Sequence, residues 1–321
     1  MTQALRHSGT QLRSEIKIFC PATIANLSCG FDVLGLCLDN VGDEMIVRKT
    51  AKKGIKITQI IGADLPLETE KNVAGVAALA MLAEVETEFG FEIEIYKKIK
   101  AGSGIGSSAA SSAGAVFGIN VLLGNPFTNT ELVKFAMQGE KLASGSAHAD
   151  NVAPALLGGF TLVRSYNPLD IIKIKSPDEM YATVIHPQIE LRTSDARSVL
   201  KQNVSLKSAI AQWGNLGGLI AGLYTDDYEL IGRSLHDEIV EPIRGVLIPG
   251  FDAMKATAME NGALGSGISG SGPSIFALSK GKAVAEKVAK AMCAIYDEMQ
   301  LPYEIHVSKV SDEGVKILNS N

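Results

Sequence analysis

The sequence predicts a protein of two domains that mixes helices and strands in irregular order, an α+β or α/β architecture. The first observation is length, because 321 residues are enough for two domains that each have a hydrophobic core. The second is periodicity, since apolar residues recur with helical spacing in some segments and alternate with polar residues in others. The third is order: these segments follow no strict strand–helix–strand alternation and no repeat of fixed period.

The first half of the chain mixes predicted strands and helices. Residues 91–97, FEIEIYK, alternate apolar and polar side chains and predict a strand with one solvent-exposed face. Residues 71–89 predict a helix, because Val73, Val76 and Ala80 fall on one stripe. The same criteria predict helices at 105–123 and 129–142, and strands at 14–20, 44–48, 55–61, 159–164, 171–174 and 181–185.

Longer helical segments follow in the second half. Helices are predicted at 205–223, 226–235, 251–261 and 282–299, with strands at 274–278 and 303–307. The turn-forming stretch 166–170, YNPLD, is a candidate boundary between the halves. We therefore predict a disordered tail at 1–15, a first domain at 16–168 and a second domain at 169–321.

Composition excludes several function classes. The net charge is −5 and no basic block occurs, which argues against nucleic-acid binding, so an anionic ligand needs a local site. The polar N-terminus has no apolar stretch of a secretory signal, and no apolar run approaches the ~20 residues of a membrane span. The four cysteines fit no zinc spacing and are expected to be reduced thiols. We therefore expect a cytoplasmic protein that binds no membrane.

A glycine-rich loop, AGSGIGSSAASSA at 101–113, joins a predicted strand to a predicted helix. Gly102, Gly104 and Gly106 allow close approach of the backbone to a ligand, and the helix start offers free N–H groups to a phosphate. Ser107 and Ser108 add hydroxyls for a phosphate oxygen or a magnesium ion. Taken alone, the loop also fits a glycine turn with a serine N-cap. It is neither a P-loop nor a dinucleotide fingerprint.

Five motifs together resemble one family. GSGIGSSAA (102–110) is similar to the phosphate-binding signature of GHMP kinases, and GALGSGISGSGP (262–273) is similar to their third glycine-rich motif. PATIANLSCGFDVLGLCLD (21–39), HADNVAPALLGG (148–159) and EPIRGVLIPG (241–250) resemble motifs of the homoserine kinases within that superfamily. The matches occur in the family's order from about residue 16 to 280, with small departures at Ile24, Ser28–Cys29 and 269–271.

The resemblance implies a fold, a reaction and partners. The fold is α+β, with an N-terminal half like domain 2 of ribosomal protein S5 and a ferredoxin-like C-terminal half. The reaction is transfer of the γ-phosphate of ATP, with Mg²⁺, to the hydroxyl of L-homoserine in threonine biosynthesis. A homodimer is expected. Alternatives are another GHMP kinase acting on mevalonate or a sugar, a ligand sensor of the same fold without turnover, and a serine hydrolase; the last lacks a nearby base and a nucleophile elbow.

The resemblance also assigns the nucleotide and metal sites. It places the adenine near Lys71 and Asn72, although Asn72 is also a good N-cap. It assigns magnesium to Ser108 and Glu140, where the alternative for Glu140 is a solvated helix carboxylate. The predicted ATP site as a whole comprises Lys71, Asn72, Gly102, Ser103, Gly104, Ile105, Gly106, Ser107, Ser108, Ala109 and Gly270.

Homoserine is a zwitterion, so its site needs both charges. Asn26 and Asp32 fit the ammonium group, while Arg197 and Arg244 fit the carboxylate. A surface ion pair is the alternative for each arginine. His148 either lines the pocket or is a satisfied polar group.

Asn151 takes the position where mevalonate-type kinases have a catalytic aspartate, and it cannot accept a proton. We hypothesise that Asn151 orients the substrate hydroxyl, that Thr193 lies near the transferred group, and that no dedicated base exists. Asp150 is a neighbouring carboxylate, but side chains adjacent in sequence usually point apart. The proton would then leave to a phosphate oxygen.

Overall fold

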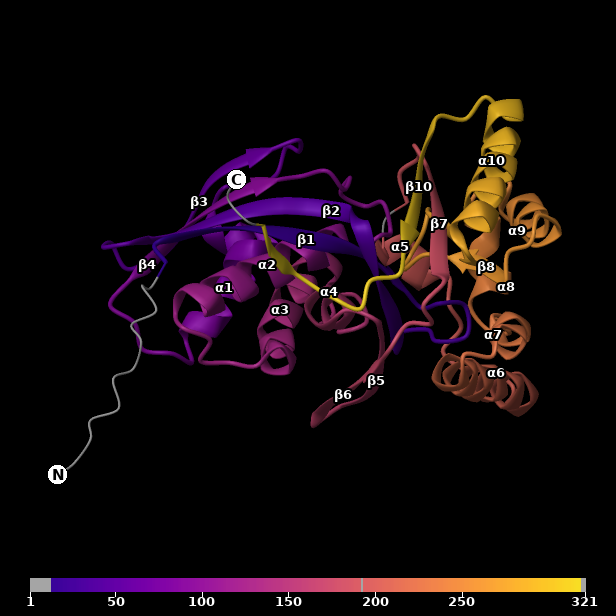
Figure 1. Cartoon of the computed structure of the whole chain (residues 1–321), viewed down its shortest axis with the longest axis horizontal. Coiled ribbons are helices and arrows are strands. Elements are labelled where there is room, and N and C mark those ends of the chain that lie inside the picture. The colour runs from indigo at the N-terminus through magenta and orange to yellow at the C-terminus, as the bar shows by residue number, and fades with distance from the viewer. Residues whose placement is uncertain (1–12, 192, 319–321) are drawn as a thin grey trace.

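The computed structural model describes residues 13–191 and 193–318, which form two sheets with helices packed on them (Figure 1). The first sheet has seven strands and contains the order β11-β1-β2-β4-β3, with the β5–β6 hairpin paired to β2. Its strands are β1 (Glu15–Ala25), β2 (Leu34–Thr50), β3 (Gly54–Ile61), β4 (Gly90–Tyr96), β5 (Phe160–Tyr166), β6 (Leu169–Ile174) and β11 (Lys316–Leu318).

The second sheet has four antiparallel strands in the order β10-β7-β9-β8. They are β7 (Met180–Pro187), β8 (Gly265–Ile268), β9 (Ile275–Lys280) and β10 (Tyr303–Lys309). Counted along the chain the order is 4-1-3-2, with helices before the second strand and between the third and fourth, which is the ferredoxin-like arrangement. The predicted ferredoxin-like C-terminal half is therefore confirmed.

Four helices cover one face of the first sheet: α1 (Val73–Leu82), α2 (Ser107–Leu122), α3 (Asn129–Ser144) and α4 (Val152–Leu157) (Figure 1). The central helix α2 carries small residues because it lies directly on the strands. A Cβ atom at Gly114 would stand 2.3 Å from the Cys20 sulfur, and one at Gly118 would stand 2.6 Å from Val47. This close packing fixes the start of α2 relative to β1 and β2.

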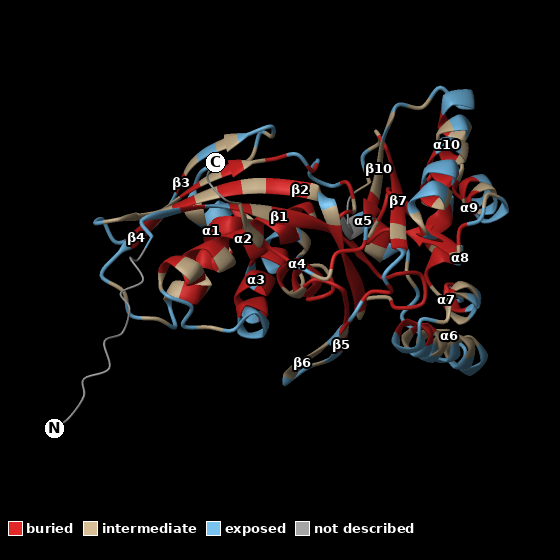
Figure 2. Cartoon of the chain, in the orientation of Figure 1, coloured by how far each residue is buried: buried red, intermediate tan, exposed pale blue. Residues whose placement is uncertain are grey.

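The second sheet carries α9 (Phe251–Glu260) and α10 (Lys282–Glu298), while α6 (Leu206–Thr225) and α7 (Tyr228–Ser234) form a pair at its edge (Figure 1). The short helices are α5 (Thr193–Ser198) and α8 (Glu241–Arg244). Single 3₁₀ turns, η1 (Thr69–Lys71) and η2 (Gly245–Leu247), complete the elements. Buried residues continue from one sheet to the other (Figure 2). Among the described helices, none has the length and apolar character that a membrane crossing requires.

Most predicted elements are present, but some boundaries are wrong. The helix predicted at 71–89 ends at Leu82, because the apolar repeat beyond it is not buried and Phe89 is 46% exposed. The glycine-rich stretch 262–273 contains strand β8, and the helices α4, α5 and α8 were not predicted from periodicity because each has six residues or fewer.

The predicted domain limits can be compared with the start of β1 and with the β5–β6 hairpin. Residues 1–12 of the predicted tail lie outside the described residues, and Glu15 begins β1. The predicted division between residues 168 and 169 falls in the turn of the β5–β6 hairpin, and β11 returns to the first sheet from the C-terminal end. As a domain boundary, this division stays a prediction.

Candidate active site

One cavity of about 520 Å³ is lined by residues from both halves of the chain. It brings together most of the residues that the sequence singled out. Those that line it are Asn26, Asp32, Lys71, Gly102, Gly104, Gly106, Ser107, Ser108, Glu140, His148, Asn151, Arg197, Arg244 and Gly270. The predicted site residues therefore converge on one place although they come from distant segments.

The glycine-rich loop adopts a conformation that requires glycine. Gly104 and Gly106 have φ angles of 81° and 71°, in the left-handed region. A Cβ atom on Gly104 would lie 2.6 Å from the Gly272 carbonyl oxygen, and one on Gly106 would lie 2.0 Å from the Thr23 hydroxyl. The loop is thus packed against the third glycine-rich motif, and any side chain at these positions would displace it.

Hydrogen bonds hold three successive carbonyl groups of this loop. The Ser274 hydroxyl donates to the carbonyl oxygen of Ser103 at 2.6 Å, and the Ser269 hydroxyl donates to that of Gly104 at 2.7 Å. The Thr23 amide donates to the Ile105 carbonyl at 3.1 Å. At the N-cap of α2, Gly106 offers no side-chain bond, so the first N–H groups of the helix stay available to an anion.

Lys97 lies beneath the start of α2 and was not predicted. Its ammonium group is paired with Asp43 and donates to the Ser107 carbonyl at 3.0 Å and the Ser111 hydroxyl at 3.2 Å. Both side chains of the pair are almost fully buried, at 2% and 1% exposure. The alternation of the predicted strand at 91–97 was a usable signal, because it puts Lys97 on the inward face with Ile95.

Glu140 is a buried carboxylate with an unsatisfied oxygen. It is 7% exposed, and its Oε1 atom has no hydrogen-bond partner. Burial raises the pKa of Glu140 to about 7, opposed by the Ser108 hydroxyl and by Lys97. A buried oxygen without a partner beside a serine hydroxyl fits a divalent cation, which Mg²⁺ sites complete with phosphates and water. No group of three or more acidic, histidine or cysteine side chains that could hold a metal occurs in the described part of the chain.

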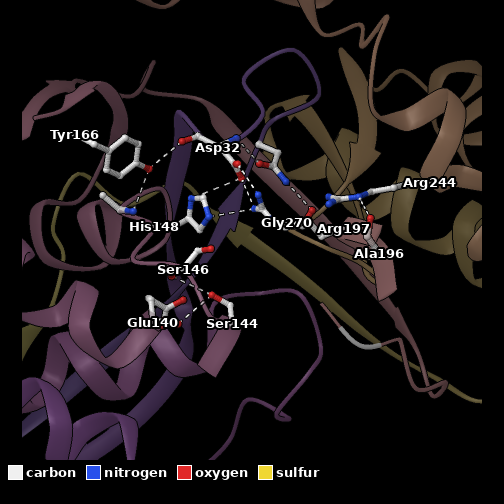
Figure 3. Close-up of polar contacts among 12 residues, drawn as sticks. Asp32, Glu140, Ser144, Ser146, His148, Tyr166, Ala196, Arg197, Arg244 and Gly270 are labelled. Carbon is white, nitrogen blue, oxygen red and sulfur yellow. Dashed lines mark hydrogen bonds and ion pairs between the residues drawn. The ribbon is translucent and has the colours of Figure 1, made fainter. Parts of the chain in front are cut away.

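A charged cluster occupies another part of the cavity (Figure 3). Arg197 donates from Nη1 to Oδ2 of Asp32 at 3.1 Å and from Nη2 to Oδ1 at 2.9 Å. The Nε2 atom of His148 lies 3.2 Å from Arg197 Nη2, and its ring makes an edge contact with Tyr166. Burial lowers the pKa of His148, which favours its neutral form in this cluster. His148 is thus part of a polar cluster that faces the cavity.

Arg244 lies beside the Phe31 ring. It is 3% exposed, and its Nε atom donates to the Ala196 carbonyl at 2.6 Å (Figure 3). Phe31 lies against both guanidinium groups, with centroid distances of 5.0 Å to Arg244 and 5.6 Å to Arg197. Burial, followed by the charge of Arg197, lowers the pKa of Arg244 to about 10, so it is a cation at neutral pH. The cavity therefore holds two cations around one aromatic ring.

Asn26 braces the loop that carries Asp32. Its Nδ2 donates to the Gly270 carbonyl at 2.6 Å, and its Oδ1 accepts from the Asp32 amide at 2.9 Å. Asn26 and Asp32 have φ angles of 74° and 59°, which asparagine and aspartate tolerate better than most residues. This bracing fixes the place of the Asp32 carboxylate.

Asn151 and Asp150 both reach the cavity, although side chains adjacent in sequence were expected to diverge. The Oδ1 atom of Asn151 accepts a hydrogen bond from the Thr23 hydroxyl at 2.8 Å. The NH₂ group of the Asn151 amide therefore points away from Thr23. Asp150 is 5% exposed, and burial raises its pKa to about 7, with further contributions from Asp32 and Glu140.

Some predicted residues do not line the cavity. Asn72 caps α1, where its Oδ1 accepts from the Ala74 amide at 3.0 Å. Ser103, Ile105 and Ala109 are buried behind the loop and the helix start. Thr193 begins α5, and its side chain lies outside the described residues. The nucleotide and catalytic roles assigned to these residues stay predictions.

Comparisons with known proteins define the class. Residues 72–159 match the model of the GHMP kinases N terminal domain, and residues 219–298 match that of the GHMP kinases C terminal. The fold is the two-domain GHMP kinase fold. The crystal structure of L. major mevalonate kinase in complex with R-mevalonate is similar in fold, with a TM-score of 0.70 at 17% identity, over 93% of this chain and 98% of that one.

Relatives of higher sequence identity identify the family within this class. The homoserine kinase of Chlorobium phaeobacteroides strain BS1 is 48% identical over 94% of this chain and 98% of its own. The crystal structure of homoserine kinase from Cytophaga hutchinsonii has a TM-score of 0.93 at 52% identity, over 98% of this chain and 100% of that one. This chain belongs to the homoserine kinase family.

Proposed function

We propose that this protein transfers the γ-phosphate of ATP to the hydroxyl of L-homoserine, giving O-phospho-L-homoserine and ADP for threonine biosynthesis. One observation carries the proposal: a single cavity joins a glycine-rich loop at a helix start to a cluster of two arginines and an aspartate. The first part suits an anionic nucleotide. The second part suits a small zwitterion.

The loop and the start of α2 would bind the phosphates of ATP. Their N–H groups can face the ligand because three loop carbonyls are bonded elsewhere. Ser108 and the unpartnered oxygen of Glu140 would hold Mg²⁺. The ion would offset the negative charge of the phosphates. Lys71, which lines the cavity, would lie near the adenine.

L-Homoserine would bind at the charged cluster. Its carboxylate suits Arg197 and Arg244 together. The Nε atom of Arg244 donates to the Ala196 carbonyl, which leaves the two terminal guanidinium nitrogens for the substrate. Its ammonium group suits Asp32. His148 and Asn26 would close the pocket around these charges. Mevalonate has a carboxylate but no ammonium group, so Asp32 favours the amino acid.

The transfer step would rest on positioning. The Asn151 amide would orient the homoserine oxygen, which forms a bond to the γ-phosphorus as the bond to the β,γ-bridging oxygen breaks and ADP leaves with the electron pair. The hydroxyl proton would pass to a phosphate oxygen of the product. Correct placement supplies at most about 7–11 kcal/mol of the barrier reduction. Thr193 would contact the transferred group.

We also propose a cytoplasmic homodimer. The four cysteines are free thiols, which suits a reducing compartment. Neither nucleic acid nor a membrane is a proposed partner, because the chain carries a net charge of −5 and lacks a basic block.

The test is ADP release from Mg·ATP with a panel of acceptors: L-homoserine, D-homoserine, L-serine, mevalonate and galactose. We expect turnover with L-homoserine alone. Turnover with mevalonate or galactose instead would retain the kinase and reject the substrate. ATP binding without turnover of any acceptor would favour a ligand sensor.

A further inference from the structure

Glu241 is a buried carboxylate at the first position of α8, one helical turn before Arg244. Its Oε1 atom accepts hydrogen bonds from the Ser28 hydroxyl and from the Ile268 amide, both at 3.1 Å. Its Oε2 atom pairs with the ammonium group of Lys255 on α9 at 2.5 Å. One side chain thus joins α8 to the loop between β1 and β2, to β8 and to α9.

Strand β8 leaves room for this carboxylate because position 267 is a glycine. A Cβ atom on Gly267 would lie 1.9 Å from Oε1 of Glu241 and 2.4 Å from the Ser28 hydroxyl oxygen. Asp237 holds the backbone of the same residue: it is 4% exposed, and its Oδ2 atom accepts from the Glu241 amide at 2.9 Å. The place of the Glu241 carboxylate is therefore fixed both from its own main chain and from β8.

The loop that Glu241 holds has a strained backbone. Asn26, Leu27 and Ser28 have φ angles of 74°, 45° and 57°, so three successive non-glycine residues lie in the left-handed region. Side chains disfavour this region, and such a run persists only where contacts from outside support it. Burial of the Leu27 side chain is one such support, and the bond from Ser28 to Glu241 is another.

This left-handed turn and α8 carry the two ends of the proposed homoserine site. Within the loop, Asn26 Oδ1 accepts from the Asp32 amide at 2.9 Å, so the turn places the Asp32 carboxylate. Asn26, Glu241 and Arg244 line one small cavity of about 10 Å³, where the turn and the helix face each other. Glu241 therefore connects the element that places Asp32 with the element that carries Arg244 (Figure 3).

We propose that Glu241 is a positioning residue, which sets the separation of Asp32 and Arg244 and so selects acceptors that carry an ammonium group and a carboxylate on one carbon. The inference rests on the proposed function, in which these two residues bind the two charges of L-homoserine. An acceptor with a single charge needs only one of them in place, whereas a zwitterion needs both at the correct distance. Loss of the connection should therefore weaken zwitterion binding most.

The test compares L-homoserine with 4-hydroxybutyrate, which has the same hydroxyl and carboxylate but no ammonium group. Glu241→Ala should raise KM for L-homoserine about 10- to 100-fold and change the inhibition constant of 4-hydroxybutyrate, measured as a competitor, less than about 3-fold. Glu241→Gln should restore most of the affinity, because its amide oxygen can still accept from Ser28 and Ile268. KM for ATP should stay constant in both variants.

A second variant removes the same bond without deleting a buried carboxylate. Ser28→Ala should raise KM for L-homoserine about 5-fold. The matched control is Thr183→Ala on β7, which removes a buried hydroxyl bonded to the Ala285 carbonyl at 2.9 Å. It should lower the melting temperature and leave both KM values unchanged, since Thr183 lies outside the cavity lining.

Two results overturn the proposal while the proposed function stands. One is an unchanged KM for L-homoserine in either Glu241→Ala or Ser28→Ala, when the variant is folded by circular dichroism. The other is an equal rise in KM for L-homoserine and in the inhibition constant of 4-hydroxybutyrate, which would show a general loss of structure at the site. A native chain that does not turn over L-homoserine rejects the proposed function, and this inference with it.

Discussion

Arg197 binds Asp32 through both of its terminal nitrogens, at 3.1 Å and 2.9 Å. The two residues were predicted to hold opposite ends of homoserine, and in the structure they hold each other. A zwitterion can exchange this one ion pair for two, by giving its ammonium group to Asp32 and its carboxylate to Arg197. In the proposed site the pair therefore keeps both binding charges in place before the substrate arrives.

We predict that Arg197→Ala raises KM for homoserine about 10- to 100-fold, because a charge-assisted hydrogen bond contributes about 1.5–3 kcal/mol. Asp32→Asn should have a similar effect. The double variant should cost less than the sum, since each single change also leaves the other charge without its partner. Initial-rate kinetics at varied homoserine concentration measures KM in the single and double variants. KM for ATP should stay constant, and Arg164→Ala, at an exposed ion pair, is the control. Additive effects would contradict a coupled pair.

Glu140 gives a prediction of pH-dependent stability. Burial raises the pKa of Glu140 from 4.5 to about 7, so the folded chain holds this proton more tightly than the unfolded chain. The stabilising contribution of the group is thus full below pH 4.5 and is lost as the pH rises through about 7. Without Mg²⁺, Glu140→Gln should melt several degrees higher than the native chain at pH 8 and like it at pH 4.5. The shift corresponds to a free energy on the order of 3 kcal/mol.

The same substitution should weaken Mg²⁺-dependent turnover, which separates this carboxylate from a purely structural one. Glu260→Gln, on the exposed end of α9, is the matched control for both measurements. Thermal unfolding curves for Glu140→Gln that coincide with those of the native chain at both pH values would show that the carboxylate is not destabilised by burial.

Asp150 and Asn151 allow a test of the proposed absence of a base. Burial raises the pKa of Asp150 to about 7, so a catalytic role for it would appear as a limb of the pH–rate profile near neutrality. We predict that Asn151→Ala lowers kcat about 100-fold and that Asp150→Asn keeps the shape of the profile. A limb that is lost in Asp150→Asn but kept in Asn151→Ala would identify Asp150 as the base.

The sequence predicts the members of the site better than their contacts. Its motifs are contiguous, so Ser108 and Arg244 could be named from local patterns. The pair of Arg197 with Asp32 joins residues 165 positions apart, and no local pattern encodes such a contact. Lys97 is intermediate, because the alternation of its strand points it inward while its partner Asp43 is 54 positions away.

In the fold, too, features set by local patterns were predicted well and features set by distant contacts were not. Strands with strict alternation, such as the one at 91–97, were predicted within a residue, because burial of one face sets their period. The helix after Asn72 was predicted to end at residue 89, seven residues beyond its last residue Leu82, since periodicity does not reveal where the supporting surface ends. The turn at 166–169 resembles a linker in composition, yet it closes a hairpin.

The contact between the two halves at the glycine-rich loop gives the last prediction. Ser274 and Ser269, from the third glycine-rich motif, donate to the carbonyls of Ser103 and Gly104. If these bonds keep the loop N–H groups directed at the nucleotide, removing them should weaken ATP binding. We expect Ser274→Ala and Ser269→Ala each to raise KM for ATP about 5- to 10-fold, as for a net hydrogen bond of about 1 kcal/mol.

The matched control is Ser279→Ala on β9, because the Ser279 hydroxyl is buried and has no hydrogen-bond partner among the described residues. It should leave both KM values unchanged. KM for homoserine should stay constant in all three variants, since the arginine cluster does not contact these serines. A parallel rise of both KM values with a lower melting temperature would instead show that Ser269 and Ser274 support the fold as a whole and do not orient the loop.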